Sequence, residues 1–437
     1  MSARRLLSIL VTTAVVGSAA AFGVTRTDRA APPTPTVAAV PVAVAQSSGE
    51  DASEHADHGA TTPEATLELQ SLLGHHVTLA IRLMRATVTG DPGFTDAANA
   101  SLVRHIGDIE QALEPVVGAD GAATFGARWE RHTQTLFQYA AAARDDDAAA
   151  REQANDELAV DLDELATMFA DLTDDMLPRA DAEEALRGIA GALTEQVDAY
   201  AAGDYERAYE LERQVFAEAW EAGQPLAEAA TGNTPGSVEY SAREQLSSAL
   251  AMLLGEHVEL AVDAMRAGVD GDDEFEAAAG ALDANTADVS EAMSGLFGDD
   301  AARRFNALWA DHIDLFVDYT VATAQDDTAE RERIHDEFVQ VIGQFGDALA
   351  TITDDRVGEA AVADALTMHE DHLLEQIDVY AEGDYEQAHD IAYTAYRHMR
   401  DVALVLADGF AAALSEQMPQ GGPETGGGGA ARAATGT

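Results

Sequence analysis

A histidine and an aspartate fifteen residues apart recur along this chain, and this repeat constrains the fold more than any other feature. The pairs are His76 with Asp91, His132 with Asp147, His257 with Asp272, His312 with Asp327, and His369 with Asp384. A sixth copy keeps the aspartate, Asp204, but has Ile189 in place of the histidine. The histidines lie on apolar stripes whose members are three or four residues apart, which is the spacing of one helix face. The repeat therefore predicts an array of helical hairpins.

The rest of the composition agrees with an all-α fold. Leu, Ala, Glu and Met fill the segments between turns, and no segment alternates as a strand would. Gly, Asp and Pro mark the turns, and the repeated Asp is well placed to cap the helix that follows it. Apolar stripes of this width are typical of helices that pack into antiparallel bundles.

The chain also repeats on a longer scale. The segment LLGHHVTLAIRLMRA from Leu72 aligns with LLGEHVELAVDAMRA from Leu253, and EQVDAYAAGDYERAY from Glu195 aligns with EQIDVYAEGDYEQAH from Glu375. The offset stays at 180 or 181 residues. We therefore predict tandem duplicated antiparallel helical bundles, with three helical hairpins per half. The predicted first bundle spans residues 63–230, the linker 231–240 and the second bundle 241–416.

Both ends of the chain differ from this pattern. Arg4 and Arg5 precede an apolar run that begins at Leu6, so residues 1–24 are predicted to be a signal peptide or an N-terminal membrane anchor. Residues 25–62 and 417–437 are expected to be a disordered linker and a disordered tail. An extracytoplasmic location follows, either secreted or anchored to the outer face of the cytoplasmic membrane. The chain has no cysteine, so an exported form must be held together without disulfides.

The net charge of the chain limits the classes of partner that it can bind. A formal net charge of −54 arises from 79 acidic and 25 basic residues. Such a surface repels nucleic acid and anionic lipid, so we expect no nucleic-acid partner and no membrane contact beyond a possible N-terminal anchor. The sequence indicates no particular protein partner.

The histidines of the second half are candidate metal ligands. If its three hairpins are related by approximate symmetry, His257, His312 and His369 lie at the same depth and converge. Three imidazoles in a bundle interior make an open site for copper or zinc. The first half has Ile189 in the third position and would be a degenerate copy.

Two further groups of residues bear on metal binding. Thioethers close in sequence to the histidines, at Met265, Met368 and Met399, favour copper. His55 and His58 offer a second, weaker metal site within the predicted linker.

Two alternatives to a metal protein stay open. Histidines on apolar stripes are more often structural, which would suit a cell-surface interaction or scaffold protein with core histidines. A small-ligand-binding or sensor bundle would instead use Trp309, Phe316 and Tyr319 to line an apolar pocket. The chain contains no Ser-His-Asp order, phosphate loop or zinc-protease motif, so we expect no enzymatic activity.

Three segments of the second half carry a family resemblance. They are LLGEHVELAVDAMRAG, LWADHIDLFVDYTVATAQDD and MHEDHLLEQIDVYAEGDYEQAHDIAYTAYRHMRDVALVLADGF. The chain resembles a group of exported bacterial helical proteins, some labelled copper amine oxidase-like, over residues 246–415 and more loosely over 64–230. The resemblance implies no amine oxidase chemistry, because the chain has no such catalytic domain. It favours copper, and the sequence thus predicts an exported, non-enzymatic metal-binding protein.

Overall fold

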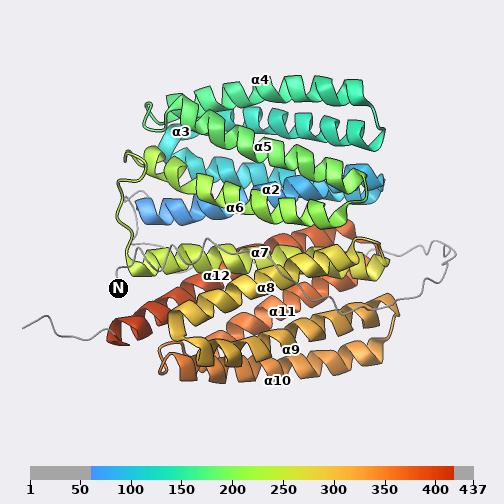
Figure 1. Cartoon of the computed structure of the whole chain (residues 1–437), viewed down its shortest axis with the longest axis vertical. Coiled ribbons are helices and arrows are strands. Elements are labelled where there is room, and N and C mark those ends of the chain that lie inside the picture. Colours follow the sequence, from blue (N-terminus) through green and yellow to red (C-terminus); the bar gives the residue numbers. More distant parts are fainter. Residues whose placement is uncertain (1–60, 418–437) are drawn as a thin grey trace, which may run out of the picture.

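The computed structural model describes residues 61–417, and every regular element in this range is an α-helix. The predicted all-α class is therefore confirmed. The helices form two stacked layers, with α2–α6 in one and α7–α12 in the other (Figure 1). The first layer contains α2 (Thr62–Thr89), α3 (Pro92–Arg144), α4 (Ala148–Leu172), α5 (Arg179–Ala201) and α6 (Tyr205–Ala230). The second contains α7 (Ala242–Asp270), α8 (Phe275–Phe297), α9 (Asp299–Ala324), α10 (Thr328–Ile352), α11 (Glu359–Ala381) and α12 (Tyr385–Gln417).

The repeated aspartate begins most of the helices that follow it. Its carboxylate accepts a hydrogen bond from a first-turn backbone N–H at five of the six positions, namely Asp91, Asp147, Asp204, Asp327 and Asp384. The repeated aspartate at Asp272 was also expected to cap the helix that follows it, and this expectation was wrong. The backbone makes a turn first, in which the Phe275 N–H donates to the Asp272 carbonyl, and α8 begins at Phe275 with Glu274 as its N-cap.

Two glycines in matching positions turn the chain between successive helical segments, one in each layer. Gly118 has φ 74° and ψ 164° and divides α3 at a kink, so α3 is two helical segments. Gly298, at the same place in the second half, has φ 84° and ψ 165° and separates α8 from α9. Side-chain-bearing residues rarely adopt a left-handed φ, so glycine is required at both corners.

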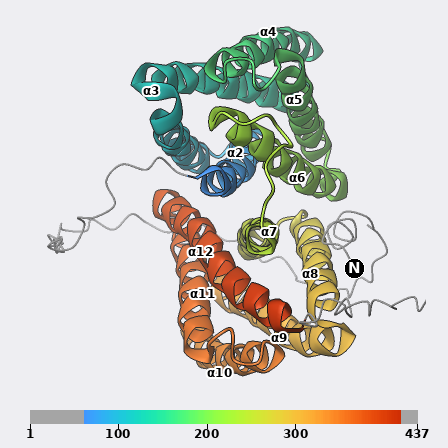
Figure 2. The same cartoon turned by 90° about the vertical axis from the view of Figure 1, so that its left-hand side faces the viewer.

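The helices α2 and α7 lie at the centre of the molecule. They are buried on nearly all sides, between residues 66 and 87 in α2 and between 247 and 267 in α7. α2 packs against α3 and α6, and α7 packs against α8 and α12. Contacts between the layers join α2 to α7, α3 to α12 and α6 to α8 (Figure 2). Because the first part of α3 corresponds to α8, and α6 to α12, this pattern is that of an approximate twofold axis between α2 and α7.

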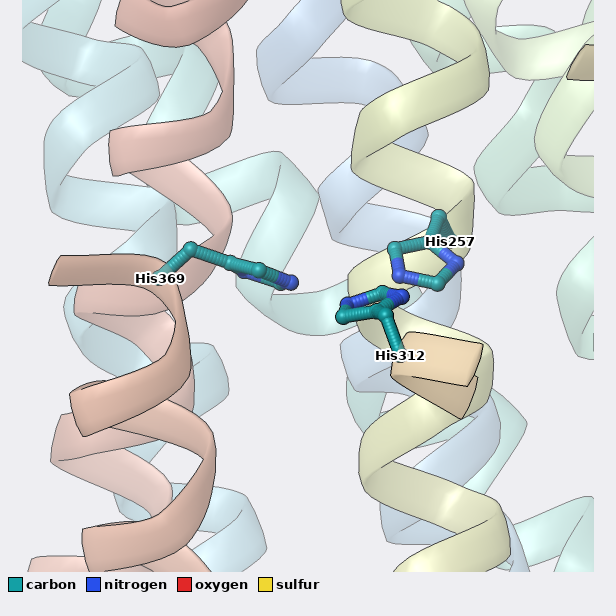
Figure 3. A group of neighbouring side chains, drawn as sticks. All are labelled: His257, His312 and His369. Carbon is teal, nitrogen blue, oxygen red and sulfur yellow. The ribbon is translucent and has the colours of Figure 1, made fainter. Parts of the chain in front are cut away.

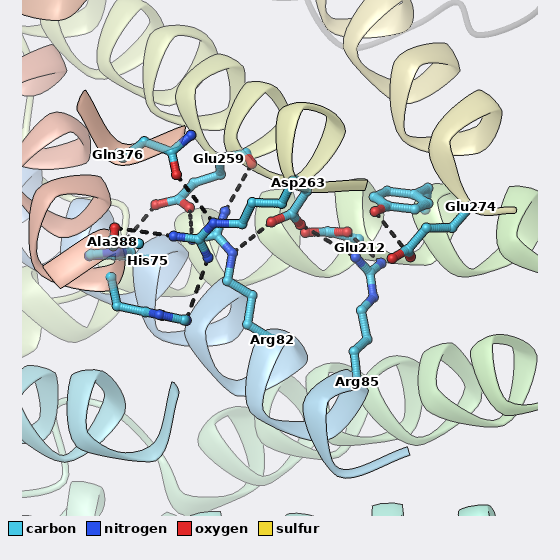
Figure 4. Close-up of polar contacts among 12 residues, drawn as sticks. His75, Arg82, Arg85, Glu212, Glu259, Asp263, Glu274, Gln376 and Ala388 are labelled. Carbon is cyan, nitrogen blue, oxygen red and sulfur yellow. Dashed lines mark hydrogen bonds and ion pairs between the residues drawn. The ribbon is translucent and has the colours of Figure 1, made fainter. Parts of the chain in front are cut away.

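A buried ion network lies between the layers (Figure 4). The Arg82 guanidinium contacts Asp263 at 2.7 Å and Glu259 at 2.5 Å. Arg82 and Asp263 occupy matching positions, 181 residues apart, and so pair with each other across the axis. Arg85 reaches Glu212 at 2.6 Å and Asp263 at 3.3 Å. Burial raises the pKa of Glu259 to about 7 and that of Glu212 to about 8, against the opposing effect of the arginines.

Within residues 61–417 no helix is both long enough and apolar enough to cross a membrane. The predicted signal or anchor, His55 and His58, residues 25–60 of the predicted linker and residues 418–437 of the predicted tail lie outside the described residues. Thr62 begins α2 and Gln417 ends α12, so the linker and the tail were each predicted to reach one residue into a helix.

Candidate metal centre

Three helices of the second layer deliver the predicted histidines to one place. His257 comes from α7, His312 from α9 and His369 from α11, and their imidazoles point toward one another (Figure 3). The ring centroids are 5.7 to 5.9 Å apart. One nitrogen from each ring lies within 4.8 Å of the other two. The predicted convergence of these three side chains is confirmed.

The site is closed to solvent, and its nitrogens are largely unpartnered. The exposed fractions are 0% for His257, 3% for His312 and 1% for His369. Neither ring nitrogen of His257 has a hydrogen-bond partner, nor has Nδ1 of His312 or of His369. A buried polar group without a partner costs about 1–3 kcal/mol, so these nitrogens call for a ligand.

Burial also sets the protonation of the three rings. Removal from water lowers the pKa of His257 and of His369 well below the ordinary value. It lowers the pKa of His312 to about 4. The imidazoles are therefore neutral near pH 7, which is the form that binds a metal ion.

The dimensions fit a metal ion after a small adjustment. Zinc–nitrogen bonds of about 2.0–2.1 Å in tetrahedral geometry place ligand nitrogens about 3.4 Å apart. The nitrogens here are separated by up to 4.8 Å. Each ring must therefore move inward by less than about 1 Å to bond a common ion, a shift that side-chain rotation supplies.

Glu370 supports the site from the side and was missed by the sequence reasoning. Its Oε1 lies 3.4 Å from Nε2 of His312, and its side chain is 4% exposed. Its Oε2 has no partner, and burial raises the pKa of this carboxyl well above its usual range. A carboxylate beside a ligating histidine orients the ring and increases its basicity. The available signal was the matching first-half position, which is Ala190.

An apolar cavity of about 60 Å³ adjoins the histidines. His312, His369 and Trp309 line one part of it, and Met293 and Met399 also face it. This volume admits a few water-sized molecules but no bulky ligand. Trp309, Phe316 and Tyr319 were predicted to line an apolar pocket. For Phe316 and Tyr319 this prediction was wrong, because neither is part of the lining of this cavity.

Phe316 and Tyr319 make other contacts. Phe316 packs edge-on against His312, with the ring centroids 4.9 Å apart. The Tyr319 hydroxyl donates to Asp378 at 2.8 Å.

Of the methionines near the predicted site, Met399 faces this cavity, as does Met293, which the sequence reasoning did not select. Met265 is buried in α7 but does not line the cavity, and Met368 is 49% exposed. One of the three predicted thioethers thus faces the cavity that adjoins the histidines.

The first half uses the same positions differently. Trp129 Nε1 donates to His76 Nε2 at 2.8 Å, so that histidine already has a partner. The matching Trp309 Nε1 instead donates to Thr286 Oγ1 at 3.2 Å, which leaves His257 free. Ile189, packed against the core, closes the third position with a hydrocarbon side chain.

Comparisons of the chain with protein-family models, with curated proteins and with solved structures found no match.

Proposed function

We propose that this chain is a non-enzymatic metal-binding protein that holds one copper or zinc ion between His257, His312 and His369. The observation that carries the proposal is the convergence of three buried, neutral imidazoles with unpartnered nitrogens. A core histidine with a purely structural role normally has a hydrogen-bond partner, as His76 has in Trp129. The predicted export segment, in residues 1–24, supports metal handling outside the cytoplasm.

The surroundings favour copper(I) over zinc. A buried site disfavours net charge. Burial favours the neutral form of Glu370, so copper(I) with three neutral imidazoles carries one positive charge, whereas zinc would carry two. Met293 and Met399 line the cavity that adjoins the histidines, and their sulfurs are soft ligands that suit copper(I). Zinc would require a fourth ligand, such as water, in a cavity whose walls are almost entirely hydrocarbon.

The test is a titration of the whole chain with copper(I) under anaerobic conditions and, separately, with zinc. His55→Ala and His58→Ala are included in every variant, so that the N-terminal histidines do not contribute. We expect one tightly bound equivalent, measured by elemental analysis after gel filtration. His312→Ala should lose it.

The matched control is His132→Ala, which removes the corresponding buried histidine of the first half and should leave binding unchanged. If the parent binds no stoichiometric metal, or if His312→Ala binds as well as His132→Ala, the proposal is rejected. The first of these results would favour the scaffold alternative with core histidines.

A further inference from the structure

A metal ion must reach the three histidines from solvent, and the apolar cavity is a poor route. The cavity reaches Val405, which is 44% exposed, and its walls are hydrocarbon apart from two histidines, Trp309 and the thioethers of Met293 and Met399. A cation that loses its water shell there gains few replacement ligands, which is unfavourable. An entry route therefore needs ligand atoms between the surface and the site.

His372 and His398 lie where such a route is needed. Both are half-buried, and their rings meet edge-on with centroids 5.8 Å apart. His372 follows His369 by three residues on α11, so the two side chains are neighbours on one helix face. His398 extends from α12, the helix packed beside α11.

The pair offers free nitrogens. His372 Nδ1 is buried and has no hydrogen-bond partner. His398 Nε2 donates to the Ala365 carbonyl at 2.9 Å, so in this tautomer its Nδ1 carries the lone pair. Two imidazole nitrogens on adjacent helices suffice for weak, exchangeable binding of copper or zinc.

Two acidic side chains, Glu375 and Asp371, lie near His372. Asp371, whose side chain is 57% exposed, lies 3.7 Å from the ring of the exposed His335. Burial and the neighbouring His398 lower the pKa of His372, while Glu375 and Asp371 act in the opposite direction. These carboxylates attract cations to the surface near the two histidines.

The first half lacks this pair together with the third buried histidine. Ala192 and Glu218 occupy the positions of His372 and His398, and Ile189 occupies that of His369. The half without the third ligand is also the half without the outer imidazoles. This joint absence indicates that the outer pair and the buried site work together.

We propose that His372 and His398 form an entry site that captures a copper or zinc ion from solvent and passes it inward to His369. This inference rests on the proposed function. The transfer is an exchange of ligands with no redox step, in which a His372–metal bond breaks as a His369–metal bond forms. The ion then completes its coordination with His257 and His312.

The test measures uptake rate and final binding separately in the full chain carrying His55→Ala and His58→Ala. Copper(I), supplied anaerobically from a weak coloured chelator, is mixed with the protein in a stopped-flow instrument. In the double variant His372→Ala/His398→Ala we expect uptake to slow by at least about tenfold. The number of bound equivalents and the equilibrium affinity should stay at the parent values, which also shows that the variant is folded.

The matched control is Glu218→Ala, which changes the first-half counterpart of His398 and should leave the rate unchanged. Unchanged uptake in the double variant overturns the entry site but leaves the buried metal centre intact. A lower number of bound equivalents also overturns it, because the two histidines would then belong to the final site. If the parent binds no metal, the proposed function itself fails and the entry site fails with it.

Discussion

The two halves of the molecule place matching histidines in different surroundings. In the first half, His76 accepts a hydrogen bond from Trp129, and Ile189 occupies the third position. In the second half, the tryptophan donates elsewhere and His369 stands in place of the isoleucine. The same helical framework therefore supports a packed core in one layer and a convergent set of ligands in the other.

Two adjacent positions of the chain contribute directly to this difference. Ile189 and Ala190 correspond to His369 and Glu370, so an apolar pair is matched by an imidazole and a carboxylate. Both members of the polar pair are buried and retain unpartnered atoms. Such groups weaken the folded state unless a ligand satisfies them. If the proposed metal ion binds, it should therefore stabilise the second half more than the first.

The two halves form one folded body whose layers meet at the buried ion network. Removing one member of this network should have the largest effect on stability. Arg82→Ala should lower the free energy of unfolding by about 3–5 kcal/mol, because Glu259 and Asp263 remain buried without their partner. Denaturant unfolding monitored by circular dichroism measures the loss. Arg104→Ala removes a largely exposed pair with Asp390 across the same interface and should cost less than about 1 kcal/mol. Equal losses would mean that the buried network does not hold the layers together.

The double substitution His369→Ile/Glu370→Ala gives the second half the residues of the first. Metal affinity should fall at least about 100-fold, because one ligand and its neighbouring carboxylate are both removed. The metal-free protein should become more stable by about 1–3 kcal/mol, since two buried groups with unpartnered atoms are gone. Competitive titration and denaturant unfolding of the metal-free form measure the two effects. A metal-free variant less stable than the parent would favour histidines with a structural role.

Replacing Trp129 or Trp309 by phenylalanine removes the indole N–H donor in one half at a time. The two variants therefore compare the contribution of the bond to His76 with that of the bond to Thr286. Trp129→Phe leaves His76 Nε2 without its donor and should cost about 1–3 kcal/mol beyond the lost ring volume. Trp309→Phe should cost less, because the Thr286 hydroxyl still donates to the Leu282 carbonyl. Both variants lose a similar ring volume, so most of the packing cost cancels when their free energies of unfolding are subtracted. A difference of zero would show that the His76 contact contributes nothing.

The smallest expected effect is that of pH on metal affinity. Protons compete with the metal only below the pKa of each free imidazole, which for His312 is about 4 and for His257 and His369 is also well below the ordinary value. Affinity should therefore change by less than about twofold between about pH 7.5 and 5.5. Histidines of ordinary pKa would lose about tenfold each over that range. A steep decline in a chelator competition series would place the bound metal outside the buried site.

Much of the fold could be predicted because its determinants are local. Helical spacing of the stripe around His257 and the side-chain caps at Asp147 and Asp327 depend on residues a few positions apart. The start of α8 was misplaced because the turn after Gly271 is longer than the others, and its length depends on local backbone geometry. Glu370 was missed because a carboxylate beside a stripe looks like an ordinary surface residue until the neighbouring helix is known.

By itself, the sequence determined the helices, their order, the 180-residue offset between the halves and the depth of each histidine on its own helix. Only the tertiary structure decided that the three rings meet, that Trp309 leaves His257 free and that Arg82 pairs with Asp263 between the layers. The physical reason is that helical periodicity acts over a few residues along the chain. Which face meets which across a core depends on the packing of several helices at once.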